Sequence, residues 1–243
     1  MALRSGRYHN LKHHKDAADK KKAASIAKMG LLITMAVQIG GSPRPDENPR
    51  LRLALTRARA VQMTNEAIER AIKKASGIGT DGKVMVELTY EGYAPGGIAV
   101  VVEALTDNRN RTAPEIKKLF EIHGGSIGAP GCVSWQFKPR AIFIVDGADD
   151  TRVMEALLDG GADAIDVTTV EDQTTVVAEP KDYDAIAKAL ATAKLSVARS
   201  DITRLPDTEV PVTDPAVAER VQALLDALDD HADVQEAFHN AGL

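Results

Sequence analysis

The residues of this chain that are best suited to chemistry are basic, and they gather near its start. Residues 12–22 read KHHKDAADKKK, and their bases occupy almost every side of a helical wheel. A helix that packs on a core keeps one face apolar, so this stretch is predicted to lie along nucleic-acid phosphates. The alternative is a solvated, charged helix end. The candidate contacts are Lys12, His13, Lys15, Lys20, Lys21 and Lys22.

Two further arginines belong to the same basic region. In residues 49–61 the apolar side chains recur at helical spacing, and Arg52 and Arg59 lie opposite this stripe. Both arginines are therefore predicted to point into solvent and to add to the nucleic-acid contact.

A third candidate site lies at residues 106–112, which read TDNRNRT. Arg109 and Arg111 precede a predicted helix whose capping box is Thr112 and Glu115. Free N–H groups at a helix start, beside two guanidinium groups, suit a phosphate or a carboxylate. In the structural alternative, the polar residues brace a turn and both arginines pair with acids of the protein.

Other motifs point away from catalysis. The stretch YEGYAPGG at residues 90–97 predicts a hairpin turn, because no Gly-Lys-Ser/Thr of a P-loop follows it and a strand follows in place of a helix. Tyr90 and Tyr93 are minor candidates for a partner contact. The single cysteine, Cys132, lies in the apolar run CVSWQF and is predicted to be a buried, unreactive thiol in a strand.

No set of residues predicts a metal, a cofactor or an acid–base pair. The histidines lack the Cys or Glu that would complete a metal site. The acids near the C-terminus are predicted to form a solvated face; they are Asp226, Asp229, Asp230, Asp233 and Glu236. We therefore expect no catalytic residues, no cofactor and no small-molecule substrate.

Charge is strongly sorted along the chain. Residues 1–76 hold 16 Lys and Arg against 6 acids, a net charge of +10, whereas residues 77–243 hold 14 against 29, a net charge of −15. Such asymmetry favours a nucleic-acid partner for the basic part. The longest apolar run, residues 29–37, is too short for a membrane span, and no signal peptide is visible. These features predict a cytoplasmic protein that does not contact membranes.

The elements that would position these residues predict an α+β fold with three domains. A basic three-helix domain covers residues 1–76. Residues 140–205 follow the order β-α-β-β-α-β of a ferredoxin-like unit. The helix and strand predicted after residue 206 cannot form a domain alone, so they are expected to complete a sheet begun at residues 83–137. The middle domain, residues 77–139 and 206–243, would then be discontinuous, with the ferredoxin-like domain inserted into it.

Several of these segments together resemble the YebC family of gene-expression regulators. The most specific are YEGYAPGG and LTDNRNRT, and NLKHHKDAADKKK, DENPRLRLAL, MTNEAIERAIKKA and DVQEAFHN occur in the family's order. The resemblance implies three domains, no known catalytic centre, and a role as a DNA-binding transcriptional regulator or as a translational activator at the ribosome. The chain departs from the family pattern near its start, where Tyr8 stands at a Trp position and His14 at an Arg position.

We therefore expect a non-enzymatic regulator that binds DNA through its basic domain. One alternative is a translation factor that contacts ribosomal RNA, since no helix shows base-reading side chains set into a helix-turn-helix. A second is a protein-interaction module whose acidic body binds a basic partner. A third is an enzyme that acts on a phosphate-bearing small molecule at Arg109 and Arg111.

Overall fold

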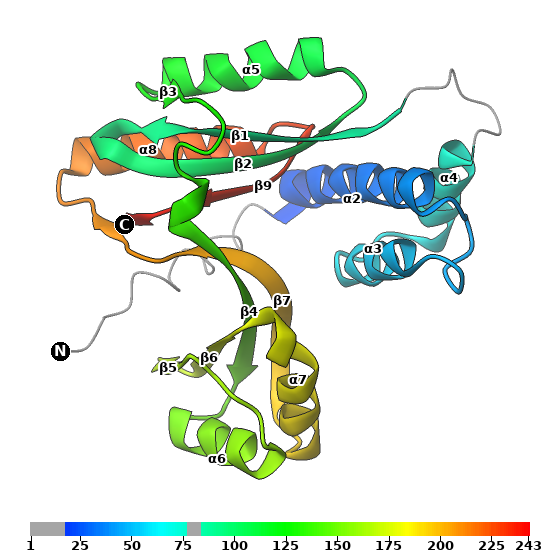
Figure 1. Ribbon diagram of the computed structural model, residues 1–243, viewed down its shortest axis with the longest axis vertical. Coiled ribbons are helices and arrows are strands. Elements are labelled where there is room, and N and C mark those ends of the chain that lie inside the picture. The colour runs from blue at the N-terminus through cyan, green and yellow to red at the C-terminus, as the bar shows by residue number, and fades with distance from the viewer. Residues whose placement is uncertain (1–17, 77–83) are drawn as a thin grey trace. The chain divides into compact units, whose positions relative to one another are not determined.

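The computed structural model describes residues 18–76 and 84–243 of the chain (Figure 1). Within these ranges, no helix combines the length and the apolar character needed to cross a bilayer. The described residues divide into two compact units. Residues 135–210 form one unit, and the second contains the N-terminal helices together with a sheet completed by the C-terminal segment.

The N-terminal region consists of three helices, as its periodicity predicted. They are α2 (Ala18–Gly40), α3 (Pro49–Ala60) and α4 (Asn65–Ala75). Their apolar faces meet in one core that contains Ile33, Leu51 and Ile68. Side chains cap two of these helices: that of Asn48 accepts a hydrogen bond at the start of α3, and that of Thr64 does so at the start of α4.

A four-stranded antiparallel sheet follows, in the order β3-β1-β2-β9. Its strands are β1 (Val86–Ala94), β2 (Ile98–Thr106), β3 (Ser126–Ile127) and β9 (Val234–His239), and the helices that accompany it are α5 (Arg109–Ile122) and α8 (Pro215–Asp229). Strand β9 pairs with β2, with Val101 opposite Phe238, so the C-terminal strand does complete this sheet. The 3-10 turn η2 (Pro95–Gly97) joins β1 to β2 and holds Gly96 and Gly97 at φ 77° and 74°, which confirms the predicted glycine turn.

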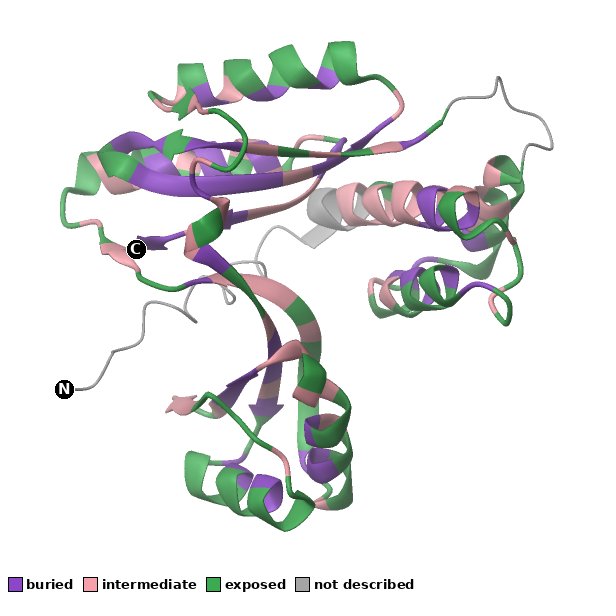
Figure 2. Ribbon diagram, in the orientation of Figure 1, coloured by how far each residue is buried: buried purple, intermediate pink, exposed green. Residues whose placement is uncertain are grey.

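The other unit has the ferredoxin-like order. Its elements are β4 (Phe137–Asp146), α6 (Asp150–Gly160), β5 (Asp166–Val170), β6 (Gln173–Ala178), η4 (Pro180–Asp182), α7 (Tyr183–Thr192) and β7 (Ser196–Pro206). All its strand pairs are antiparallel, in the order β5-β6-β4-β7. One core joins the inner side chains of the two helices to the sheet, among them Phe143, Val153 and Ile186. Figure 2 shows this division of α6 and α7 into a buried and an exposed side.

The α+β class, the helical N-terminal region and the inserted ferredoxin-like unit are thus confirmed, while the exact domain boundaries stay a prediction. The prediction of a strand over CVSWQF is wrong. The first five residues of this run form a loop and the 3-10 turn η3 (Ser134–Gln136), and β4 begins only at Phe137. The short strands β8 (Val210–Pro211) and β10 (Ala241–Gly242) lie outside both four-stranded sheets.

Candidate nucleic-acid interface

Helix α3 presents a basic surface. Its sequence, PRLRLALTRARA, contains four arginines and no acid. Leu51, Ala54, Leu55 and Ala58 face the helical core and are buried. Arg52, Thr56 and Arg59 follow one another at i, i+4 and i+7 on the opposite side, where all three are exposed. The structure therefore places Arg52 and Arg59 on one solvent stripe, as the periodicity predicted.

The two arginines of this stripe differ in how they are held. The Arg52 guanidinium donates long hydrogen bonds, of 3.4 Å each, to the carbonyl oxygens of Pro45 and Asp46. Neither bond neutralises its charge, because both acceptors are backbone groups. Within the described ranges Arg59 has no carboxylate partner. Both guanidinium charges are thus available to an anion.

The remaining basic candidates lie at or beyond the edge of the described chain. Lys20, Lys21 and Lys22 belong to the first turns of α2. Lys12, His13 and Lys15 lie outside the described residues, so their predicted phosphate contacts stay a prediction.

The start of α5 differs from the predicted capping box. The helix begins at Arg109, and its N-cap is Asn108, whose side-chain oxygen accepts a hydrogen bond of 3.3 Å from the backbone N–H of Arg111. Thr112 therefore lies inside the helix, where its side chain is fully buried. Consequently, Arg109 and Arg111 do not precede the helix but form part of its first turn.

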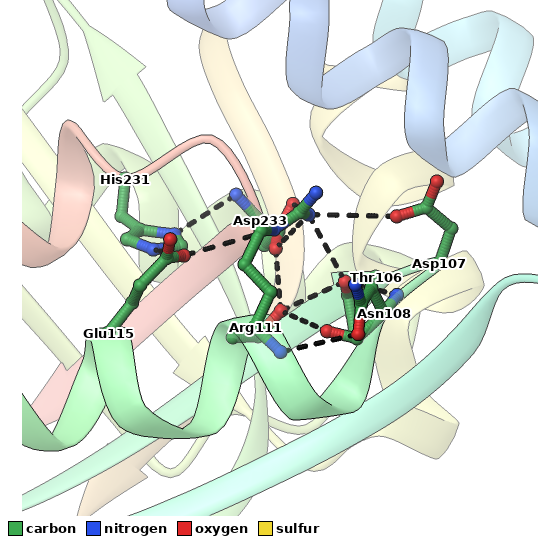
Figure 3. A network of polar contacts seen from close by, with 8 residues as sticks. Thr106, Asp107, Asn108, Arg111, Glu115, His231 and Asp233 are labelled. Carbon is green, nitrogen blue, oxygen red and sulfur yellow. Dashed lines mark hydrogen bonds and ion pairs between the residues drawn. The ribbon is translucent and has the colours of Figure 1, made fainter.

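Arg111 is engaged within the protein. Its Nη2 group donates to both carboxylate oxygens of Asp233, at 3.0 and 2.7 Å (Figure 3). Asp107 and Glu115 lie farther away, at 3.6 and 3.9 Å. Hydrogen bonding to Asp233 raises the pKa of Arg111, so the guanidinium stays charged. The structural alternative, in which this arginine pairs with acids of the protein, describes Arg111.

Asp233 is the buried centre of this network and not part of a solvated acidic face. Asp233 as a whole is only 6% exposed, and the Thr112 hydroxyl donates a hydrogen bond to its Oδ2 atom at 2.6 Å. Burial by itself would raise the pKa of Asp233, but hydrogen bonds from Thr112 and Arg111 outweigh burial and lower it. Thr106, also buried, accepts a bond of 3.4 Å from Arg111. The network therefore ties α5 to the ends of β2 and β9.

The surroundings of Arg109 differ from those of Arg111. It is exposed, and it lines a hollow of about 290 Å³ whose other walls are Leu88, Thr89, Tyr90, Glu91, Ala113, Ile127, Gly128 and Pro130. Burial raises the pKa of Tyr90, and the neighbouring Arg109 charge partly opposes that shift. The hollow thus combines a cation, a phenol and an apolar wall. At this size it lies at the small end of ligand pockets, so it fits a single ring or side chain better than a large cofactor.

Glu91 also lines the hollow, but its carboxylate is occupied. It accepts hydrogen bonds from the backbone N–H groups of Gly131, Val133 and Ser134, at 2.7, 2.9 and 2.8 Å. These bonds lower the pKa of Glu91, although burial opposes them. The carboxylate fixes the loop that the sequence pattern had assigned to a strand. Within it, Cys132 is half-buried, and burial raises the pKa of its thiol, as suits an unreactive cysteine.

Sequence reasoning missed the role of Asp233 and of Thr106. Both depend on strand pairing between segments more than a hundred residues apart, since Leu105 donates its backbone N–H to the carbonyl of Asp233 at 2.7 Å. No local signal marked Asp233 among the neighbouring acids. In the described part of the chain, no group of three or more His, Cys, Asp and Glu is placed to hold a metal ion.

Comparison with known proteins gives consistent matches over almost the whole chain. Residues 6–78 match the family model described as the TACO1/YebC protein N-terminal domain, and residues 85–241 match the one described as the TACO1/YebC second and third domain. A protein of Syntrophomonas wolfei is 39% identical over 96% of this chain and 94% of its own length, and one of Halothermothrix orenii is 40% identical over 95% and 91%. Both carry the name probable transcriptional regulatory protein.

The solved structures include a similar fold. The crystal structure of a conserved hypothetical protein from Aquifex aeolicus matches with a TM-score of 0.80 at 36% sequence identity. The match covers 95% of this chain and 94% of that one.

Proposed function

The chain belongs to the TACO1/YebC family, and on this basis we propose that it is a non-enzymatic regulator of gene expression that binds nucleic acid through its basic helical region. The names of its relatives, probable transcriptional regulatory protein, favour DNA as the target. The proposed contacts are those of the N-terminal stretch and of α3, namely Lys12, His13, Lys15, Lys20, Lys21, Lys22, Arg52 and Arg59.

The observation that carries this proposal is the solvent stripe of α3. Arg52 and Arg59 are exposed, are seven residues apart on one helix face, and have no described carboxylate partner. Seven residues of helix span about 10 Å, so the pair suits two phosphates of one backbone. Phosphate-dominated binding is sensitive to salt and weakly sensitive to sequence.

A second candidate function is a translation factor that contacts ribosomal RNA. The sequence of α3 contains no Asn or Gln, the side chains that most often read adenine in the major groove. A helix that lacks these amides and whose exposed arginines contact phosphates suits structured RNA as well as a DNA duplex.

We propose Arg109 as a further contact, separate from α3. Its exposed guanidinium beside Tyr90 and an apolar wall would hold a phosphate while a ring occupies the hollow. Arg111, which is bonded to Asp233, is proposed to position the helix that carries Arg109. Arg109→Ala should therefore weaken binding without changing the midpoint of urea unfolding, and Lys118→Ala on the same helix is the matched control.

The test of the α3 contact uses the full chain with a fluorescent DNA duplex and with a ribosomal RNA fragment, and measures affinity against salt concentration. Arg52→Gln combined with Arg59→Gln should reduce the slope of log affinity against log salt by about two, because each lost phosphate contact removes roughly 0.9. Arg152→Gln with Lys181→Gln removes the same charge from exposed positions of the ferredoxin-like unit and serves as control.

The outcomes separate the candidates. Equal slopes for the two double variants would contradict the α3 contact. Tight binding to ribosomal RNA with weak binding to DNA would favour a function in translation. Tight binding to DNA with weak binding to ribosomal RNA would favour a function in transcription. Binding of neither nucleic acid would leave the protein-interaction alternative as the better account.

A further inference from the structure

Helix α6 of the ferredoxin-like unit carries two large apolar side chains on its solvent side. Met154 is 50% exposed and Leu158 is 75% exposed. They are four residues apart, so they lie one above the other on the same face. The core of the unit is contacted by other residues of the helix, Val153, Ala156 and Leu157. The packing of α6 on its own sheet therefore does not account for Met154 or Leu158.

The stretch of chain that carries these two side chains is acidic. Between residues 149 and 166 the chain has six acids and one base, Arg152. All six acids are exposed; they are Asp149, Asp150, Glu155, Asp159, Asp163 and Asp166. Glu155 and Asp159 directly follow Met154 and Leu158 in the chain, and among the described residues neither has a cationic partner. Their charges are thus free to meet a partner's cations.

We propose that this surface, which we call the α6 strip (Met154, Leu158, Glu155 and Asp159), docks a basic amphipathic segment of another protein. An apolar centre with a charged rim is the usual anatomy of a specific protein interface. The negative rim favours a segment whose apolar side chains cover Met154 and Leu158 while its lysines or arginines face the acids. The same acids disfavour nucleic acid at this surface.

The α6 strip does not depend on the nucleic-acid contact proposed for α3. It lies in the other compact unit and has the opposite charge. A chain with both surfaces would link a nucleic acid to a protein, and the protein contact would persist in variants that have lost the α3 arginines.

The test uses the full chain and a synthetic amphipathic helix with leucines on one face and lysines on the other. Fluorescence anisotropy gives its affinity, and amide hydrogen exchange locates the protected segment. Met154→Ser combined with Leu158→Ser should weaken binding at least tenfold, and Glu155→Gln with Asp159→Gln should weaken it and flatten its salt dependence. Ile122→Ser, at a position 64% exposed on α5, is the matched control for loss of an exposed apolar side chain.

The expected result also includes protection of α6 and little binding of a peptide whose lysines are replaced by glutamates. Equal affinity of the Met154/Leu158 double variant, or protection confined to other elements, would overturn the proposal. Self-association that is abolished by Leu158→Ser would overturn it in favour of a second copy of this chain. Because all four positions are exposed, the variants should keep the melting temperature of the parent protein, which is measured in parallel.

Discussion

Two arginines separated by a single residue, Arg109 and Arg111, have different surroundings. Arg111 donates to the carboxylate of Asp233, whose side chain is only 8% exposed, whereas Arg109 is exposed at the rim of a hollow. The local sequence gives no signal that distinguishes them, since both lie in NRNRT. The difference arises because the strand that follows Asp233 pairs with β2 and brings its carboxylate beside the first turn of α5.

Replacement of Arg111 should measurably destabilise the protein. Arg111→Ala leaves the buried Asp233 carboxylate with the Thr112 hydroxyl as its main donor. We expect a loss of about 1–2 kcal/mol in the free energy of unfolding, because hydrogen bonds to charged groups contribute roughly 1.5–3 and this arginine is partly exposed. Urea unfolding measures the change. Lys117→Ala, which breaks an exposed pair with Glu121, should cost under about 0.5 kcal/mol, and equal losses would refute the difference.

His239 should make stability depend on pH in the mildly acidic range. Burial lowers the pKa of this partly buried side chain from 6.5 to about 4. Between these values the unfolded chain binds a proton that the folded chain does not, so the stabilisation is complete above the unfolded pKa and is lost as the pH falls. We expect a loss of about 2 kcal/mol between about pH 7 and about pH 5.

Urea unfolding of the parent protein and of His239→Gln across this range measures the effect. The variant should lose most of the dependence, and an unchanged profile would exclude His239 as its source. The lowered pKa values of Asp233 and Glu91 act in a different window. Their contributions are present above the unfolded values of 3.8 and 4.5 and are lost as the pH falls below them.

At the scale of elements, Asn48 fixes the join between α2 and α3. Its side chain is buried, accepts from Leu51 N–H at 3.0 Å, and donates to the carbonyl oxygens of Ala36 and Ser42 at 2.8 and 2.9 Å. A Cβ at Gly40 would collide with this side chain, so that glycine is required for close approach and not for its φ angle. The α3 arginines therefore depend on a buried amide for their placement.

Asn48→Ala should cost about 2–4 kcal/mol, because the cap contributes roughly 1 and a buried carbonyl left without its donor costs roughly 1–3. Asn48→Asp keeps the cap acceptor but places a buried carboxylate oxygen against the carbonyl oxygens of Ala36 and Ser42, so its loss should be at least as large. Hydrogen exchange should show faster opening of α3 in both variants. An alanine variant as stable as the parent would show that water replaces the amide.

Most helices and strands could be predicted from the sequence, and the exceptions share one cause, which is a contact with a distant segment. The core-facing stripes of α3, α4 and α6 follow from periodicity, because apolar burial on one face is a local property of sequence. At the start of α5, Asn108 and Thr112 are both acceptable caps by residue type, and the choice of Asn108 depends on the burial of Thr112 against Asp233, which is a tertiary contact. The pattern of CVSWQF predicts a strand. Its backbone N–H groups at Val133 and Ser134 instead donate hydrogen bonds to the side chain of Glu91, which belongs to a distant segment.

At the scale of the whole molecule, the boundaries of the inserted unit can be tested directly. The predicted limits, 140 and 205, lie inside a ladder in which Phe137 pairs with Pro206 and Lys138 with Leu205. A fragment of residues 135–210 should therefore fold cooperatively, and a fragment of residues 140–205 should unfold at lower urea concentration, since it lacks these pairs and the buried Phe137. Circular dichroism measures both, and equal midpoints would support the shorter boundaries.

The order of the elements, the sorted charge, the exposed face of α3 and the resemblance to a family all follow from the amino-acid sequence alone. Each of these depends on residue types at short spacing. The folded chain, by contrast, sets which arginine of NRNRT is bonded to the protein, which C-terminal acid is buried, and which apolar side chains of α6 are left uncovered. These properties depend on pairing between distant segments, because burial and hydrogen-bond partners are set by what the folded chain places alongside a residue.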